Sequence, residues 1–359
     1  MLDTRVTSII PIHNSEQYLQ SCLSSISQQT EKGIQVIMID DASDDDSLQI
    51  AEEFSKQDPR FQIISFRENK GVNAARNAAL DKAIGTYIAF CDSDDTVPPD
   101  AYQKLADAAD KGKFDIVIGA HEDHNDEGFC ALRPLRRNTG NLDSFMQTST
   151  VWERVWRRSF IEKNHLRYEN FLMGGDAVFV ANAYRCRPRY GFLNDCIYHY
   201  WTHNKGNTPS IVNTVSNSYF QDCLRCCDEI AAILRTVCPD EADDYVYVKK
   251  LAYLRSRFMR IIDGKEAEPA FDAFKLFLKQ YDWSVYLDVF RAEFGMSLEE
   301  MEPLSALEYH LRCGNCLQGT LEPRDQVLVE FRKGKIGFQY ILQYMKAWIG
   351  YKLGRDSRL

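Results

Sequence analysis

The clearest candidate for chemistry is a run of carboxylates, Asp92, Asp94 and Asp95, directly after an apolar stretch that ends at Phe90. Three carboxylates this close repel one another unless a cation lies among them or the turn exposes them to water. Oxygen ligands of this kind suit Mg²⁺ or Mn²⁺, and such ions are typically shared with substrate phosphates. The run therefore predicts a metal site with a diphosphate leaving group, and an ordinary acidic turn is the alternative.

Polar residues also follow the other apolar stretches in this part of the chain. They are His13 and Asn14, Asp40 and Asp41, and the triplet Arg67 to Asn69. In open α/β sheets, ligands bind at the carboxyl ends of the strands. If the apolar stretches are strands of one sheet, these side chains gather at a single edge with the carboxylate run.

The pattern of residues 6 to 120 predicts a sheet that would bring these polar side chains to one edge. Short β-branched runs alternate with helical stretches, which predicts a parallel sheet with helices on both faces. The expected strands are Val6–Ile12, Ile34–Asp40, Phe61–Phe66, Tyr87–Asp92 and Asp115–Ala120. The expected helices are Glu16–Gln28, Ser47–Gln57, Asn73–Ile84 and Asp100–Asp110. Strands buried on both faces explain why these runs are continuously apolar.

Beyond residue 126 the alternation ends. Helices are expected at Val151–His165 and Gly175–Arg185, and a short strand around Cys196–Trp201. From about Ser216 the sequence is helical in character. One apolar stripe predicts a helix that Gly264 terminates; its residues are Tyr247, Leu251, Leu254, Phe258 and Ile261. The expected fold class is α/β with a mostly parallel central sheet, followed by a mainly α-helical C-terminal region.

The ordered segments PIHN, VIMIDDASDDDS and ENKGVNAARNAALDKAIGTYIAFCDSDD resemble the family 2 glycosyltransferases of the GT-A (Rossmann-like) fold. The resemblance is close over Thr4 to Ala120 and looser to about Ser210. It implies a metal-dependent, inverting transfer of a sugar from a nucleotide donor, with UDP favoured, to a hydroxyl of a glycan or lipid-linked acceptor. The expected domains are a glycosyltransferase domain at 1–210, with its nucleotide-binding half at 1–120 and its acceptor half at 121–210, and a helical domain at 211–331.

The resemblance also implies which residues bind the nucleotide sugar. Asp40 and Asp41 match paired acids that accept a hydrogen bond from the nucleotide base. Arg76 matches an arginine that lies over the nucleotide and its diphosphate, and its planar charged fork suits phosphate. A surface position on an amphipathic helix is the alternative for Arg76. The other expected members of this set are Pro11, His13, Asn14, Asn69, Gly71, Asp92, Ser93 and Asp94.

The carboxylate run matches the D-x-D-like motif of the family. There the first acid contacts the sugar or ribose, and the last binds the metal that bridges the two phosphates. The expected metal ligands are Asp94, Asp95 and His203, and the expected ion is Mn²⁺ or Mg²⁺. A bound dication stabilises the charge that develops on the departing diphosphate. For His203, which lies in the stretch YHYWTH, a structural histidine is the alternative.

An inverting transfer also needs a base for the acceptor hydroxyl. The segment FLMGGDAVFVANAY aligns with the family element that carries this base, so the resemblance implies that Asp176 is the catalytic base. A simple helix N-cap is the alternative for Asp176. Gly175 departs from the family, which commonly has glutamate there, and this departure is what favours the runner-up, a non-catalytic nucleotide-sugar-binding or assembly protein.

Two tryptophans precede this element. Trp152 and Trp156 lie four residues apart, on one face of the helix expected there. We expect both in the hydrophobic core, and a platform for stacking a sugar is the alternative.

Composition excludes several classes of protein. The 359 residues suffice for about two domains, and the net charge of −9 lacks the basic footprint of a nucleic-acid binder. No apolar run reaches the roughly 20 residues of a membrane-spanning helix. A dehydrogenase or a sugar nucleotidyltransferase would need a glycine-rich motif after an early strand, and PIHNSEQYL is not one.

The 11 cysteines, on a chain with no visible export signal, favour reduced thiols and a cytoplasmic protein. The pairs Cys223/Cys226 and Cys313/Cys316 could hold zinc in principle. The two pairs are far apart in the sequence, and Cys223, Cys226 and Cys227 have the spacing of a helix face. Both observations favour cysteines on a buried helix face instead of a zinc site.

Residues 332–359 form a basic aromatic segment. It carries seven basic residues and one acid, a net charge of +6 that leaves −15 for the rest of the chain. An apolar, aromatic-rich stretch flanked by lysine and arginine predicts a peripheral anchor on the anionic inner face of a membrane. Packing on the body of the protein, or on a second subunit of a homo-oligomer, is the alternative.

Overall fold

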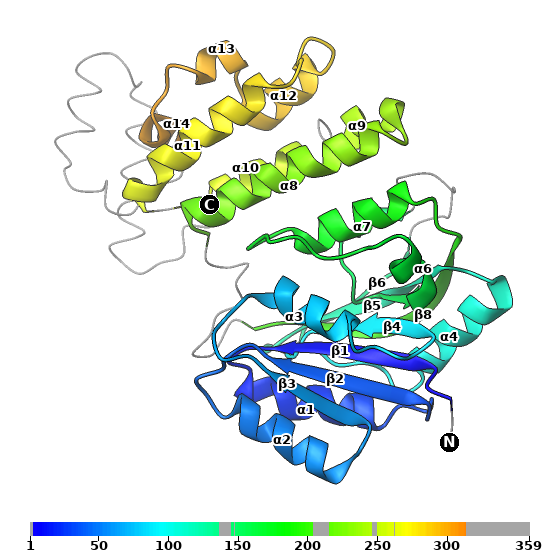
Figure 1. Cartoon of the computed structure of the whole chain (residues 1–359). Coiled ribbons are helices and arrows are strands. Elements are labelled where there is room, and N and C mark those ends of the chain that lie inside the picture. The colour runs from blue at the N-terminus through cyan, green and yellow to red at the C-terminus, as the bar shows by residue number, and fades with distance from the viewer. Residues whose placement is uncertain are drawn as a thin grey trace. The chain divides into compact units, whose positions relative to one another are not determined.

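The computed structural model describes residues 3–135, 145–146, 148–203, 215–245, 250–261 and 263–313. The chain divides into two compact units (Figure 1). The first comprises Met1–Ser210 with Thr236–Cys238, and the second comprises Ile211–Arg235 with Pro239–Leu359.

The first unit is built on an eight-stranded sheet with the order β3-β2-β1-β4-β7-β5-β6, and β8 pairs with β5. The strands are β1 (Val6–Ile12), β2 (Ile34–Asp40), β3 (Phe61–Ser65), β4 (Tyr87–Phe90), β5 (Ile116–Asn125), β6 (Cys130–Arg133), β7 (Arg154–Arg157) and β8 (Tyr190–Thr202). The pairs β1/β2, β1/β4, β2/β3 and β5/β8 are parallel, whereas β6 and β7 pair antiparallel with their neighbours. The expected α/β fold with a mostly parallel sheet is confirmed.

Helices alternate with the first strands as expected. They are α1 (Glu16–Ser27), α2 (Ser47–Gln57), α3 (Val72–Leu80) and α4 (Ala101–Gly112). In Figure 1, α1 and α2 lie on one side of β1 to β3, and α3 lies on the other. Every residue of β1 and β2 is buried, and α1 turns a stripe of four apolar side chains to the core. The strand ends therefore emerge between two helical layers.

The helix expected at Val151–His165 is wrong. This segment forms β7, followed by the short helix α6 (Arg158–Lys163). β7 fills the place between β4 and β5, and Val155 lies opposite residues of both strands. Positions 151 to 156 are all buried, including the charged Glu153 and Arg154, so polar residues do not mark an exposed face in this segment. Trp152 and Trp156 are 7% and 0% exposed, so their expected place in the core is confirmed.

The remaining elements of the first unit agree with the pattern. Helix α7 (Gly175–Arg185) has the expected bounds. Strand β8 is longer than the stretch expected around Cys196–Trp201, because it pairs along the whole of β5 with irregularities beside Ala120.

The described part of the second unit is helical, as expected. Its helices are α8 (Asn217–Arg235), α9 (Pro239–Asp244), α10 (Leu251–Phe258), α11 (Gly264–Lys279), α12 (Leu287–Phe294), α13 (Leu298–Met301) and α14 (Ala306–Arg312). Its core holds Phe220, Phe258, Phe271, Phe274 and Tyr309, all fully buried.

Gly264 does not terminate a helix, contrary to expectation. α10 ends at Phe258, and Gly264 opens α11, where the side chain of Asp263 caps the first turn. Of the predicted stripe, Tyr247 lies outside the described residues. Cys223, Cys226 and Cys227 lie buried on α8, as the helical spacing predicted, and Cys316 lies outside the described residues.

Residues 332–359 also lie outside the described part of the chain. Among the helices that are described, none is both long enough and apolar enough to cross a membrane.

Candidate active site

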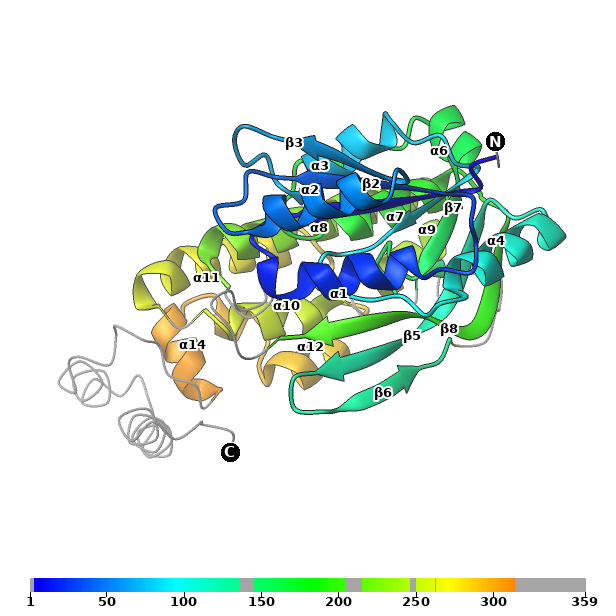
Figure 2. The ribbon, with the colours of Figure 1, turned by 90° about the horizontal axis from the view of Figure 1, so that it is seen from below.

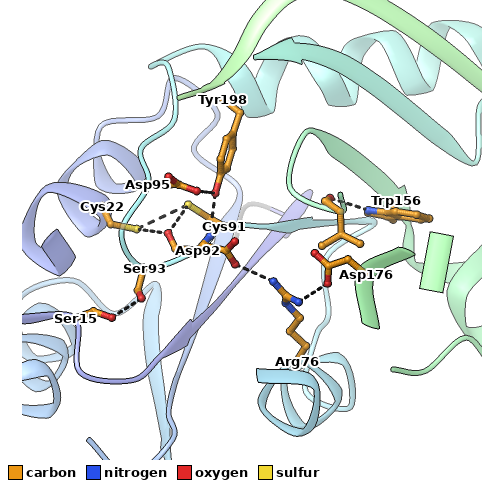
Figure 3. A network of polar contacts seen from close by, with 11 residues as sticks. Ser15, Cys22, Arg76, Cys91, Asp92, Ser93, Asp95, Trp156, Asp176 and Tyr198 are labelled. Atoms are coloured by element: carbon orange, nitrogen blue, oxygen red, sulfur yellow. Dashed lines mark hydrogen bonds and ion pairs between the residues drawn. The ribbon is translucent and has the colours of Figure 1, made fainter. Parts of the chain in front are cut away.

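The carboxylate turn begins where β4 ends. All four residues of β4 are buried, and the turn closes with a hydrogen bond from the Asp95 amide to the Asp92 carbonyl. Asp95 points into the protein and is 1% exposed. Its carboxylate accepts a hydrogen bond from the Tyr198 hydroxyl at 2.7 Å (Figure 3). It accepts a second one from the Trp201 amide at 2.7 Å. Both oxygens of this predicted metal ligand are therefore already engaged by β8.

Asp94 lies beside the predicted metal-binding histidine. Its carboxyl is partly buried, and burial together with the charge of Asp92 raises its pKa to about 6. Nε2 of His203 lies 3.4 Å from the backbone oxygen of Asp94, and Nδ1 lies 2.9 Å from a carboxylate oxygen of Asp126. A proton on Nδ1 that is donated to Asp126 leaves a lone pair on Nε2, on the side of Asp94. The structure thus brings Asp94 and His203 together.

Arg76 joins two predicted site residues that are far apart in sequence. It lies on α3, is 4% exposed, and donates to Asp92 at 2.8 Å and to Asp176 at 2.5 Å (Figure 3). Its guanidinium lies 5.3 Å from the ring centre of Tyr168. Its burial between two carboxylates excludes the alternative of a surface position on α3. The place over a diphosphate that the family resemblance implies stays a prediction.

Asp176 lies in the first turn of α7. Burial raises its pKa to about 6, while the positive charge of Arg76 acts in the opposite direction. The residue before the helix, Gly174, has a φ of 89°, a conformation that glycine adopts at little cost. This backbone turn directs the Asp176 carboxylate toward Arg76.

Gly175 is a glycine because its neighbour leaves no room. A Cβ at this position would lie 2.5 Å from Nδ2 of Asn73. That amide cannot easily move, since it donates to the backbone carbonyls of Glu169 and Phe171, both at 2.9 Å. The departure from the family pattern therefore has a local packing reason, and Asp176 keeps its place beside it.

The two acids that end β2 differ in their contacts. Asp41 accepts from the amides of Lys70 and Gly71, at 2.7 and 2.8 Å, and so fixes the turn before α3. The contacts of the Asp40 carboxylate are longer, at 3.4 Å from the Ser43 amide and 3.4 Å from the Ser65 hydroxyl. Both acids are buried.

Other predicted nucleotide-binding residues gather at the same edge. His13 lies 2.9 Å from the backbone oxygen of Asp41 and 3.1 Å from the side-chain amide of Asn69. The Asn14 side chain accepts from the amide of Asp44 at 2.8 Å. Ser93 makes a hydrogen bond of 2.7 Å with the hydroxyl of Ser15. Pro11 differs, because it is a buried residue within β1, opposite Ile39.

Several residues that support this edge were not predicted. Tyr198 holds Asp95 and also accepts from the Asp92 amide at 3.0 Å. Tyr168 stacks on Phe179, with 4.3 Å between ring centres, and lies beneath Arg76. In the stretch YHYWTH only His203 was predicted to belong to the site. The spacing of residues in this stretch does not indicate that Tyr198 contacts Asp95.

Comparison with known proteins shows the family to which the chain belongs. The model of the family described as glycosyl transferase family 2 matches residues 7–180. Glycosyltransferase GlyG of Streptococcus pneumoniae serotype 4 is 34% identical over 214 residues, which cover 54% of this chain and 70% of GlyG. The chain belongs to glycosyl transferase family 2.

Two further proteins are similar to this chain at lower sequence identity. Poly(ribitol-phosphate) beta-glucosyltransferase of Bacillus spizizenii is 25% identical over 222 residues, 60% of this chain and 35% of that protein. The 1–349 fragment of S. aureus TarS, solved in complex with UDP-GlcNAc, covers 99% of this chain and 93% of its own length with a TM-score of 0.60. At 18% identity this likeness shows the fold alone. The chain spans 60%, 31% and 62% of the length of three other curated relatives.

Proposed function

We propose that this protein is a metal-dependent glycosyltransferase that uses a UDP-linked sugar and inverts the anomeric carbon. The observation that carries the proposal is the contact of Arg76 with both Asp92 and Asp176. It joins the D-x-D-like turn, where a donor would bind, to an acid that can act as a base on an acceptor. UDP is favoured because the fold resembles that of TarS in complex with UDP-GlcNAc.

The residues around Asp94 fit a divalent ion. The partly buried carboxyl of Asp94 lies next to a second acid, so a cation would relieve their repulsion, and Nε2 of His203 faces the same turn. We assign Asp94, Asp95 and His203 as the ligands; each oxygen of Asp95 accepts one hydrogen bond from β8 and keeps a lone pair that can bind the ion. When bound, Mn²⁺ or Mg²⁺ would stabilise negative charge on the departing diphosphate.

The chain's own residues supply the rest of the mechanism. Asp176 removes the proton from an acceptor hydroxyl, whose oxygen forms a bond to the anomeric carbon. The bond from that carbon to the diphosphate oxygen breaks, and UDP departs with the electron pair. Arg76 holds Asp92 and Asp176 at a fixed separation, so that a sugar contacting the first acid is within reach of the second.

The nucleotide would bind over the edge formed by β1 and β2. Asp41 is occupied with the turn before α3, so we assign the contact with the nucleotide base to Asp40. His13, Asn14 and Asn69 line the same edge and are proposed to complete this subsite.

The acceptor is proposed to be a hydroxyl of a glycan or of a lipid-linked intermediate. The relative named poly(ribitol-phosphate) beta-glucosyltransferase supports an acceptor of the cell-envelope polymer class. Such acceptors are consistent with the proposal that the protein works on the cytoplasmic side of a membrane, where residues 332–359 would hold it.

A thermal-shift panel tests the donor site. UDP, GDP, CMP and several UDP-sugars are compared, each with and without Mn²⁺, on the wild type and on Asp94→Ala. A ligand that binds only the folded state stabilises it by about 2.7 kcal/mol at a hundredfold excess over its dissociation constant. We expect stabilisation by uridine nucleotides that requires Mn²⁺ and is lost in the variant.

A second assay separates binding from chemistry. Release of UDP from UDP-sugars is followed with a mixture of glycan and lipid-linked acceptors. Stabilisation without UDP release would favour the non-catalytic binding protein, and no stabilisation by any nucleotide would overturn the proposed donor site.

A further inference from the structure

A second group of side chains able to bind metal lies on β5, β6 and β8, which run side by side (Figure 2). It comprises two groups that share one carboxylate: Glu122 with His124 and Cys130, and Glu122 with Cys196 and His199. None of these residues is part of the proposed donor or acceptor site. They contribute two imidazoles, two thiols and one carboxylate.

Strand register places these side chains on one face of the sheet. Glu122 and His124 are two residues apart on β5, so their side chains leave the same face. His124 lies opposite Cys130 of β6, and Glu122 lies opposite His199 of β8. Directly paired residues share a face, so the four side chains leave the same face of the sheet although they come from three strands.

The ligand atoms of Glu122, His124 and Cys130 are separated by nearly the distances of a tetrahedral site. Oε2 of Glu122 lies 3.3 Å from Nε2 of His124 and 3.6 Å from Sγ of Cys130, and the last two atoms are 3.9 Å apart. Zinc bonds of about 2.0 to 2.3 Å place ligand atoms about 3.3 to 3.8 Å from one another. Nε2 of His199 lies 3.8 Å from the same Glu122 oxygen.

His199 is oriented for metal binding through its other nitrogen. Nδ1 lies 3.3 Å from the hydroxyl of Thr96, and the backbones of these two residues pair in an isolated bridge. A proton on Nδ1 donated to Thr96 fixes the ring and leaves Nε2 with a lone pair toward Glu122. His124 is held in turn by stacking on Trp201, with 4.8 Å between ring centres.

We propose that Glu122, His124 and Cys130 bind Zn²⁺, and that His199, which lies with Glu122 and Cys196 in the structure, joins them as the fourth ligand when the ion binds. A thiolate and two imidazoles suit zinc and exclude Mg²⁺ as the natural occupant, since Mg²⁺ prefers oxygen ligands. The cluster is accessible, because Cys130 is exposed and the other ligands are only partly buried. Thr96 directly follows Asp95, so the ion would brace β8 against the end of the carboxylate turn.

Cobalt substitution tests the proposal on the full chain. The protein is dialysed against a chelator under reducing conditions and titrated with Co²⁺, whose thiolate-to-metal charge-transfer band reports a bound cysteine. Zn²⁺ affinity is then measured by competition with a chromophoric chelator. We expect the band to saturate at the intensity of one thiolate-bound Co²⁺ per chain, and Zn²⁺ to abolish it.

Variants assign the ligands. Cys130→Ser should remove the charge-transfer band, and His124→Ala and Glu122→Gln should each weaken Zn²⁺ binding at least tenfold. Cys186→Ser, at the end of α7, is the matched cysteine control and should behave as the wild type. Thermal unfolding of each variant without metal confirms that it folds, and Cys130 is exposed enough for its replacement to be tolerated.

The oxygen-rich donor site gives no thiolate band, so it does not interfere with the readout. A band that survives in Cys130→Ser and is lost in Cys196→Ser would overturn the ligand set proposed here. No band in the reduced wild type, or equal Zn²⁺ affinity in all variants, would overturn the site itself.

Discussion

Arg76 sets the electrostatics of the candidate site. Its buried guanidinium uses two of its nitrogens for Asp92 and Asp176, and its charge opposes the effect of burial on the Asp176 pKa. Lysine could not replace it, because a single ammonium cannot present two donors in a fixed plane. One side chain from α3 thus joins Asp92 to Asp176, the proposed base.

Replacing Asp176 by asparagine removes the proposed base with little change in shape. Because an amide cannot take the acceptor proton, UDP release with acceptor should fall by about 10² to 10⁴-fold. Stabilisation by UDP with Mn²⁺ should persist. Glu52→Gln, on the surface of α2, is the control and should keep full activity. Wild-type rates in Asp176→Asn would remove this residue from the chemistry.

The pH dependence follows from the same group. Burial raises the pKa of Asp176 to about 6. Only the ionised carboxylate accepts a proton, so kcat/KM should rise with pH through about 6 and level off above it. Removing the charge in Arg76→Gln should move this rise to higher pH. Because the pKa of Asp94 is also raised to about 6, rates are measured at saturating metal ion. A flat profile across this range would contradict the assignment.

The contact between Gly175 and Asn73 predicts a strong coupling. In Gly175→Ala the new Cβ collides with an amide held by two backbone carbonyls, so the free energy of unfolding should fall by about 1 to 3 kcal/mol. In an Asn73→Gly background the added methyl has room. In that background, Gly175→Ala should lower the free energy of unfolding by at least about 0.5 kcal/mol less than it does in the wild type, as measured by chemical denaturation. Additive costs would show that space does not explain this glycine.

Strand β8 determines how the carboxylate turn is presented. The Tyr198 hydroxyl donates to the Asp95 carboxylate and accepts from the Asp92 amide. Tyr198→Phe leaves both buried groups short of a partner, and the free energy of unfolding should fall by about 1 to 3 kcal/mol. Weaker stabilisation by UDP with Mn²⁺ should accompany it.

Tyr200→Phe is the matched control for that substitution. Like Tyr198, Tyr200 lies on β8 and stacks on Trp152, so the variant loses a hydroxyl without losing a ring. Equal effects of the two substitutions on nucleotide binding would show that β8 acts through packing and not through Asp95.

The elements differ in how well the sequence predicts them. From β1 to α4 each element carries its own period or apolar run, and the expected bounds are close to those observed. β7 is buried on both faces between β4 and β5, so its position depends on strands that are distant in sequence. The inward orientation of Asp95 likewise depends on Tyr198 and Trp201, which no local pattern around the carboxylate run could indicate.

At the scale of the whole molecule, every predicted catalytic, nucleotide-binding or metal-binding residue falls in the first unit, none of them beyond His203. The excess of positive charge lies at the other end of the chain. Residues 332–359 carry a net charge of +6, and the rest of the chain carries −15. A protein with a strongly acidic remainder is repelled by anionic lipid unless a local basic segment overcomes that repulsion.

Binding to vesicles tests whether this segment has that role. Each basic residue near an anionic surface contributes about 1 kcal/mol, so replacing Lys346, Lys352 and Arg355 by glutamine should weaken binding to anionic vesicles on the order of 100-fold at low salt. Trp348→Ala should weaken binding to anionic and neutral vesicles alike, because it removes apolar burial and no charge.

Salt separates these two contributions further, since screening reduces only the electrostatic one. If residues 332–359 instead pack on a second subunit, deleting them should convert the oligomer to a monomer, as judged from the molecular mass in solution. Vesicle binding should then stay unchanged. Because the two readouts are independent, this comparison decides between a membrane surface and another copy of the chain as the partner of the basic segment.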